Sequence, residues 1–276
     1  MARTVAIANQ KGGVGKTTTC LNLGAALAAR GYRVLLVDLD PQGSLTSAAG
    51  IEPNELADTV YSAMMHYLQE NEAPDLGGYL HAIGPSLDIL PANIELSVAE
   101  VELQNAIRRE YVLAEVLDPV ADRYDVVLVD CPPSLSLLTV NALTAADEVL
   151  IPVVPEYLAA RGLGLLLNMI QRVRKSRLNP RLAIAGVLLT MVDQRTSHGQ
   201  EVVRSIRAHL DGLAPILGEV KRTVKVSEAS AAGVPLLRYA ARSDSAQAYD
   251  RVADALVQRW ALGASVGIRE DVHAAR

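Results

Sequence analysis

The sequence predicts an α/β fold in which a mostly parallel, twisted sheet is covered by helices on both faces. Strand-like and helix-like patterns alternate along the chain, which is typical of such sheets. Several strand-like runs are apolar at consecutive positions, as expected for strands buried on both faces. The chain has 276 residues, half of them hydrophobic, enough for a substantial core. We expect a single domain over residues 1–262 and a frayed tail over 263–276.

The most informative segment lies close to the N-terminus. A short apolar run at residues 4–8 is followed by a glycine-rich loop, and residues 20–30 then form an Ala- and Leu-rich helix. Glycines let backbone N–H groups turn inward, and a helix N-terminus favours anions, so this arrangement predicts a phosphate cradle. We expect Lys16 to contact the β- and γ-phosphates and Thr17 to hold Mg²⁺. The segment therefore predicts a P-loop NTPase.

Two apolar strand-like runs end in carboxylates. Residues 33–40 end in Asp38 and Asp40, which share a face if the strand stays regular up to the turn at the following proline. Residues 124–130 end in Asp130, which fits a Walker B carboxylate that holds Mg²⁺ through water. The carboxyl ends of parallel strands form the ligand-binding edge of a sheet. Both runs therefore direct acidic side chains toward the predicted phosphate cradle.

Composition excludes several classes of protein. No apolar run approaches the roughly 20 residues of a membrane-spanning helix. The two cysteines, Cys20 and Cys131, are too few for a disulfide framework, and the N-terminal residues do not have the pattern of a signal peptide. We therefore expect a cytoplasmic protein. The net charge of −5 is unevenly distributed, because residues 161–225 carry +8 and the remainder −13. A local basic face on an acidic protein is therefore expected.

The middle of the chain carries weaker signals. Asp58 and Thr59 can cap a helix that continues to about residue 68. Residues 95–108 show a helical pattern, with apolar positions at Leu96, Ala99, Leu103 and Ile107. We expect this region to contact cargo, although it indicates no mechanism.

Three motifs together resemble the nucleotide-binding boxes of the ParA/MinD ATPases, and the resemblance spans about residues 2–260. Lys11-Gly12-Gly13-Val14-Gly15-Lys16-Thr17-Thr18 is similar to the family's deviant Walker A box. The sequences Asp-Leu-Asp-Pro-Gln-Gly, from residue 38, and Asp-Cys-Pro-Pro-Ser, from residue 130, resemble its two switch segments. The chain looks like the short, Soj-like type of partitioning protein.

The resemblance implies roles for individual residues. Lys11 would cross a dimer interface to the partner's ATP, and the catalytic residues would be Lys11, Lys16 and Asp40. Thr17, Asp40 and Asp130 would serve the metal, and Asp38, Pro132 and Pro133 would belong to the switches. The nucleotide-binding residues would be Lys11, Gly12, Gly13, Val14, Gly15, Lys16, Thr17, Thr18, Glu156, Met191, Lys221 and Arg222. DNA would be bound by Arg195, Arg222 and Lys225.

The function implied is an ATP-dependent, homodimeric ATPase that binds double-stranded DNA without sequence specificity. With Mg²⁺ and a ParB-like activator it would partition a chromosome origin or a plasmid and associate with the nucleoid. A MinD-like membrane-cycling ATPase, or one that positions a protein cargo, is an alternative, although residues after Trp260 make a poor amphipathic anchor. An iron–sulfur reductase of the nitrogenase iron-protein type is disfavoured by the placement of both cysteines. A scaffold without ATPase activity is disfavoured because Lys16, Thr17, Asp40 and Asp130 are all present.

Overall fold

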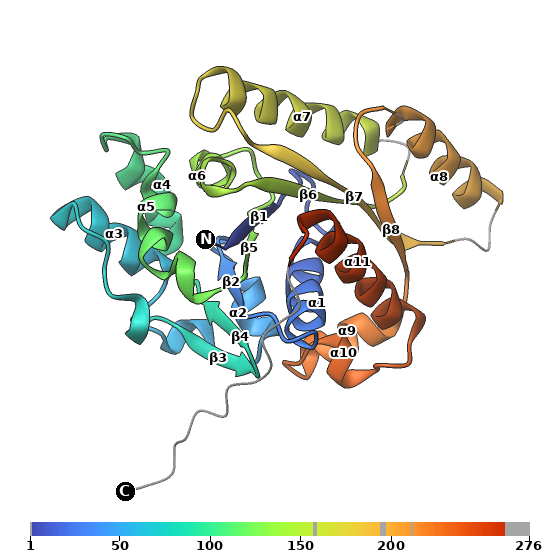
Figure 1. Ribbon diagram of the computed structural model, residues 1–276, viewed down its shortest axis with the longest axis horizontal. Coiled ribbons are helices and arrows are strands. Elements are labelled where there is room, and N and C mark those ends of the chain that lie inside the picture. The colour runs from blue at the N-terminus through green and yellow to red at the C-terminus, as the bar shows by residue number, and fades with distance from the viewer. Residues whose placement is uncertain (1, 157–158, 194–196, 211, 263–276) are drawn as a thin grey trace, which may run out of the picture.

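Eight strands form one twisted sheet in the computed structural model, which describes residues 2–156, 159–193, 197–210 and 212–262 (Figure 1). The strand order is β3-β4-β2-β5-β1-β6-β7-β8, and every neighbouring pair is parallel except β3 and β4. The strands are β1 (Arg3–Ile7), β2 (Val34–Asp38), β3 (His81–Gly84), β4 (Leu87–Leu90), β5 (Val126–Asp130), β6 (Glu148–Val153), β7 (Ala183–Val192) and β8 (Ile216–Lys221). The predicted fold class is confirmed.

Helices follow most of the strands and connect them across the sheet. The α-helices are α1 (Lys16–Ala28), α2 (Ser44–Ala48), α3 (Val60–Glu70), α4 (Leu96–Gln104), α5 (Val112–Leu117), α6 (Leu137–Ala145), α7 (Ala159–Lys175), α8 (Ser197–Leu210), α9 (Val224–Ala231), α10 (Leu236–Tyr239) and α11 (Asp244–Trp260). Three short 3₁₀ turns are η1 (Pro53–Glu55), η2 (Leu76–Gly78) and η3 (Asp118–Arg123). Within the described ranges, no helix is both long and apolar enough to cross a bilayer.

The sheet separates two apolar cores. Alternate residues of each strand point to opposite faces, so Val5 and Ile7 of β1 pack with α1 and α11, whereas Ala6 packs on the other side with α3 to α8. Figure 1 shows the same two layers, with α11 lying beside α1. Because both faces are covered, the central strands are apolar throughout, which explains the continuous hydrophobic runs in the sequence.

The strand order brings the predicted motifs to one edge of the sheet. β1 lies between β5 and β6, and the chain leaves it directly into the glycine-rich loop and α1. Asp130 at the end of β5 is in register with Ile7 of β1 and with Asp38 of β2. Three neighbouring parallel strands therefore end together, where open α/β sheets bind their ligands.

One helix differs from its prediction. The pattern over residues 95–108 predicts a single apolar face, but α4 ends at Gln104, and Ile107 is 92% exposed. Arg108 has a positive φ of 56°, a left-handed backbone conformation in which a helix cannot continue. Thr59 is the N-cap of α3, as predicted, and its N–H donates to the Ser62 hydroxyl at 2.9 Å. The predicted tail at 263–276 lies outside the described residues.

Candidate nucleotide-binding site

The glycine-rich loop has the backbone of a phosphate cradle. Gly13 and Gly15 have φ values of 71° and 83°, in the left-handed region that glycine adopts without strain. Gly15 is the N-cap residue of α1, so the free N–H groups of the first helical turn face the loop. Gly12 faces the loop after β5, where a Cβ placed on it would lie in ordinary contact with Cβ of Pro133, at 3.9 Å. The loop can therefore surround an anion with backbone N–H groups.

Two polar side chains hold this loop against the sheet. Asn9 donates to the carbonyl of Pro152 at 2.7 Å and accepts the N–H of Lys11 at 3.0 Å. The Thr190 hydroxyl, at the end of β7, donates to the carbonyl of Val14 at 2.8 Å. Asn9 and Thr190 are both buried, so these bonds are protected from water and fix the loop before any ligand arrives.

The two lysines of the loop have different surroundings. Lys16 is 6% exposed, and burial lowers its pKa although the neighbouring Asp130 and Asp40 oppose the shift. Its ammonium group lies 3.4 Å from the carbonyl oxygen of Lys11, a weak contact that leaves it available to a phosphate. Lys11 is exposed and forms an ion pair with Glu156 of the same chain. Glu156, which was predicted to contact nucleotide, thus contacts Lys11 in this structure.

The carboxylates at the strand ends form a buried acidic group beside Lys16. Neither oxygen of Asp130 has a hydrogen-bond partner, although the Thr17 hydroxyl is close enough to lower the Asp130 pKa. Burial, followed by the charge of Asp38, outweighs that contact and raises the pKa of Asp130 well above its ordinary value. A buried carboxylate without a partner is costly, so this environment fits a cation.

Asp38 and Asp40 are separated by the end of the strand. Asp38 is fully buried, and its Oδ2 accepts both the N–H and the hydroxyl of Thr46 in α2, each at 2.8 Å. Burial raises the pKa of Asp38 to about 6. Asp40 lies beyond β2, where its N–H donates to Asp38 at 3.2 Å and its Oδ1 accepts the N–H of Gln42 at 3.0 Å. The regular strand therefore ends at Asp38, and the turn sets the position of Asp40. Asp38 itself anchors α2 through Thr46.

The side chains of this acidic group fit Mg²⁺ shared with a phosphate ligand better than a metal ion whose ligands all come from the protein. Thr17, Asp40 and Asp130 offer hard oxygen donors around the mouth of the loop. Within the described ranges no group of three or more His, Cys, Asp or Glu side chains is arranged as a complete metal site. Mg²⁺ in nucleotide sites uses one or two protein ligands and completes its shell with phosphate oxygens and water.

A cleft of about 210 Å³ opens on the α9 side of the loop. Gly15 and Thr18 line it together with three residues predicted from the resemblance, Met191, Lys221 and Arg222. Met191 has a positive φ of 51°, unusual for a side chain of this size, at the point where β7 ends. The cleft has mixed polar and apolar walls beside the phosphate cradle, as a nucleoside requires.

The predicted DNA-binding residues are partly described. Arg222 and Lys225 are exposed around the start of α9, where Lys225 forms an ion pair with Glu228 at 2.7 Å and its ammonium lies 5.9 Å from the centroid of the Tyr239 ring. Arg195 lies outside the described residues. Pro132 is buried and Pro133 exposed, between Asp130 and α6.

Four residues of the site were not predicted from sequence. Asn9 and Thr190 brace the loop, while Thr223 and Tyr249 line the cleft with the predicted residues. A polar residue at the end of an otherwise apolar strand is the signal that could have identified Thr190. Tyr249 lies in the middle of α11, and no local pattern in the sequence connects it to residue 15.

Comparison with known proteins agrees with this geometry. The AAA domain family model matches residues 2–184. The chromosome partitioning protein ParA of Caulobacter vibrioides is 46% identical over 259 residues, covering 93% of this chain and 94% of the relative. The sporulation initiation inhibitor protein Soj of Bacillus subtilis is 46% identical over 250 residues, covering 90% and 96%.

A solved structure with the same fold contains nucleotide and metal. It is described as cobyrinic acid a,c-diamide synthase from Mycobacterium smegmatis with bound ADP and magnesium, and it superposes with a TM-score of 0.81 at 39% identity. The match covers 95% of this chain and 96% of that structure. From the motifs, the sheet order and these matches we conclude that the chain belongs to the AAA domain family and, within it, to the ParA/Soj partitioning proteins.

Proposed function

We propose that this protein is a partitioning ATPase that binds ATP and Mg²⁺ in the glycine-rich loop and, in the ATP state, dimerises on DNA. The observation that carries the proposal is the partnerless, buried Asp130 carboxylate beside Lys16 and Thr17. A site that encloses both an unpaired anion and a cation suits a ligand that brings a metal ion and phosphate groups together. Relatives named for chromosome partitioning support the cellular role.

The residues of the loop and of the neighbouring strand ends have distinct roles in this proposal. The N–H groups from residue 12 onward hold the phosphates, and Lys16 neutralises charge on the transferred group. Thr17, Asp40 and Asp130 would hold Mg²⁺, which would supply positive charge to the phosphates. Asp40, beyond the end of β2, orients the attacking water. The cleft lined by Met191 and Arg222 takes the nucleoside.

Lys11 couples nucleotide binding to dimerisation. In the single chain its ammonium pairs with Glu156, so it has to leave that carboxylate before it can contact a partner's ATP. The two side chains are 43% and 52% exposed, and such exposed ion pairs contribute less than about 1 kcal/mol. A triphosphate offers a stronger contact, so the internal pair does not prevent the exchange.

The ATP dimer would bind double-stranded DNA through Arg195, Arg222 and Lys225, and a ParB-like protein would stimulate hydrolysis and release it. Contacts from lysine and arginine to phosphates carry no sequence information, so DNA binding is expected to be independent of the base sequence. The protein would then act in the cytoplasm, on the nucleoid.

Replacement of Lys16 tests the nucleotide site. Lys16→Ala is expected to weaken ATP binding about a hundredfold or more, because a buried charge-assisted contact worth about 3 kcal/mol is lost. Isothermal titration calorimetry with ATP and Mg²⁺ measures this, and Lys175→Ala, an exposed lysine at the end of α7, is the matched control. Equal ATP affinity in wild type and Lys16→Ala would refute the cradle assignment.

A second variant separates binding from turnover. Asp40→Ala is expected to keep ATP but hydrolyse it slowly, and so to accumulate as an ATP dimer on DNA. Gel shifts with ATP, ADP and no nucleotide, together with size-exclusion chromatography, follow this state. A variant that stays monomeric with ATP would contradict the proposed cycle.

A further inference from the structure

Helix α4 is apolar on two opposite faces. Leu96, Ala99 and Leu103 are fully buried against the sheet. Val98 and Val101 of the helix are 44% and 59% exposed, and Ile94, 57% exposed, lies in the turn just before it. The three follow one another at spacings of four and three residues, and Glu95, which joins Ile94 to the helix, has helical backbone angles. Residues at these spacings share one face of a helix, so the three side chains form an apolar stripe toward solvent. Single exposed apolar residues are ordinary, but a stripe along one helix marks a contact surface.

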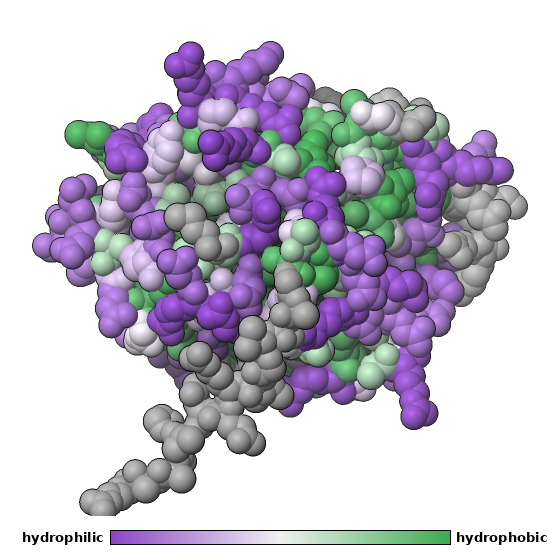
Figure 2. Space-filling model, in the orientation of Figure 1, coloured by the Kyte–Doolittle hydropathy of each residue, from purple (hydrophilic) through white to green (hydrophobic). Residues whose placement is uncertain are grey.

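The stripe leads into a hollow beside it. A cleft of about 930 Å³ lies between α3 and the end of α4, and its walls include Tyr61, Met65, Tyr79 and the highly exposed Ile107. Asn105, four residues after Val101 and hence on the stripe's side of the helix, also lines the cleft. Figure 2 shows apolar side chains protruding among hydrophilic ones where Figure 1 places α3, α4 and α5. Glu102, next to Val101, also lines the cleft, so the stripe and the cleft are neighbours, and together they are here called the α4 surface.

The chain segment that carries the α4 surface is strongly acidic. Residues 50–120 contain thirteen acidic residues and only two arginines, a formal charge of −11. Both arginines are already paired, Arg108 with Glu115 at 3.0 Å and Arg109 with Glu110 at 3.1 Å. Among the residues that the structure describes, Glu95, Glu100 and Glu102 of this helix segment form no ion pair. By helical spacing Glu95, three residues before Val98, and Glu102, four residues after it, flank one side of the apolar stripe, and both are exposed.

We propose that the α4 surface docks a basic, amphipathic helix of a partner protein. The apolar face of such a helix would cover Ile94, Val98 and Val101, with its end in the cleft, and its lysines and arginines would face Glu95 and Glu102. The charge argues against the other occupants. Nucleic acid and anionic membranes are repelled, and a second copy placed with the same surface would bring like charges together.

A model peptide tests the proposal without nucleotide or DNA, so its failure is separable from failure of the ATPase proposal. The probe is a fluorescent peptide of about 18 residues with leucines on one face and lysines on the other, and its twin carries glutamates instead of lysines. Fluorescence anisotropy is expected to show binding of the lysine peptide alone. The pair Val98→Ser/Val101→Ser is expected to weaken it roughly tenfold or more.

Two further variants separate the apolar and ionic contributions. Glu95→Gln/Glu102→Gln is expected to weaken binding and flatten its dependence on salt. Leu213→Ser, which alters an apolar residue 59% exposed beyond α8, is the matched control and is expected to bind like wild type. All variants change exposed side chains, so thermal unfolding reports whether the fold is intact.

Three results would overturn the proposal. The first is equal binding of the lysine and glutamate peptides, and the second is unchanged binding by Val98→Ser/Val101→Ser. The third is concentration-dependent self-association of the wild type that Val98→Ser/Val101→Ser abolishes in sedimentation velocity, because the surface would then belong to a second copy.

Discussion

At the scale of single residues, the site is built from charged groups whose burial is only partly compensated. Lys16 and Asp130 lie in the same buried environment, which lowers the pKa of the lysine and raises that of the aspartate. Both shifts disfavour the charged forms, which shows that burial outweighs their mutual attraction. A ligand that brings phosphates to the lysine and a cation to the carboxylate relieves both costs. Outside the site, Asp125 shows the opposite balance, because its hydrogen bonds outweigh burial and favour the charged form.

Asp125 is a structural residue, and it predicts a pH dependence of stability. Its side chain accepts hydrogen bonds from the Arg33 guanidinium and backbone N–H, each at 2.8 Å, and these hold its pKa below the ordinary 3.8. The ionised form is therefore the stabilising one, so its contribution is present above the unfolded-state pKa and lost as pH falls through the lower, folded-state pKa. Asp125→Asn is expected to destabilise by about 1 kcal/mol at pH 7.

Urea unfolding measures this difference at a series of pH values. The gap in the free energy of unfolding between Asp125→Asn and wild type is expected to be full above about pH 5 and to narrow as the pH falls through the folded-state pKa, which lies below 3.8. Glu72→Gln, at an exposed carboxylate, is the control. A gap that stays constant over this range would show that the hydrogen bonds do not depend on the charge.

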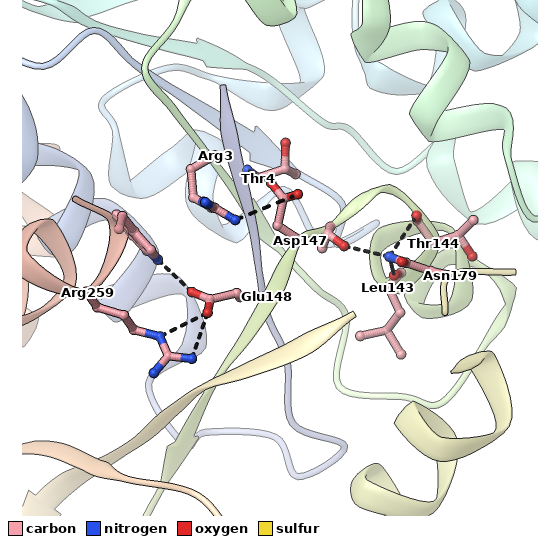
Figure 3. A network of polar contacts seen from close by, with 10 residues as sticks. Arg3, Thr4, Leu143, Thr144, Asp147, Glu148, Asn179 and Arg259 are labelled. Carbon is pink, nitrogen blue, oxygen red and sulfur yellow. Dashed lines mark hydrogen bonds and ion pairs between the residues drawn. The ribbon is translucent and has the colours of Figure 1, made fainter. Parts of the chain in front are cut away.

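At the scale of elements, the ends of helices are fastened to the strands that carry the site. Figure 3 shows Glu148, at the start of β6, facing Arg259 at the end of α11. Glu148 accepts hydrogen bonds from Arg259 Nε at 2.9 Å and from Trp260 Nε1 at 2.6 Å. In the same view Asn179 donates to the carbonyls of Leu143 and Thr144 and so closes the end of α6. The contacts of Glu148 hold α11, which supplies Tyr249 to the nucleoside cleft.

Removal of the Glu148 carboxylate is expected to loosen α11. Glu148→Ala leaves the nearly buried indole N–H of Trp260 without an acceptor, and should cost about 2 kcal/mol. Differential scanning calorimetry gives the loss, and Glu201→Ala, an exposed acid on α8, is the control. A melting temperature equal to that of wild type would mean that α11 is held by its apolar face alone.

At the scale of the whole molecule, charge is separated along the chain. The basic segment at 161–225 follows an acidic one at 50–120, in a protein whose net charge is only −5. Such separation allows an overall acidic protein to approach DNA with one side and a basic partner with another. The basic segment is proposed to bind DNA and the α4 surface a basic partner protein, so binding at each can be altered and measured without the other.

Reversal of charge in the basic segment is expected to remove DNA binding. Arg195→Glu/Lys225→Glu should abolish the ATP-dependent gel shift and keep ATP-driven dimerisation. In wild type, the logarithm of affinity should fall with the logarithm of salt concentration, with a slope of about −0.9 for each phosphate contacted. Arg109→Glu/Arg123→Glu changes the net charge equally, outside the segment, and is the control. Undiminished DNA affinity in Arg195→Glu/Lys225→Glu would place the DNA-binding surface elsewhere.

The sequence alone determined the parts of this protein that depend on neighbours in the chain. The strand, the glycine-rich loop and the start of α1 are contiguous, and the glycine at residue 15 is required by its own backbone conformation. The apolar runs ending in Asp38 and Asp130 identify buried strands because a strand covered on both faces is apolar at every position. Such patterns are readable locally, so fold class and nucleotide motifs could be predicted.

Only the tertiary structure decided how distant residues meet. Thr190 binds the carbonyl of Val14 from a position 176 residues away, and Lys11 finds Glu156 across a similar span. Ile107 fits a helical pattern, yet α4 ends at Gln104 and the side chain of Ile107 lies in solvent. The physical reason is that propensity and periodicity act over a few turns or strand residues, whereas burial, pKa and pairing depend on which elements the sheet order places side by side.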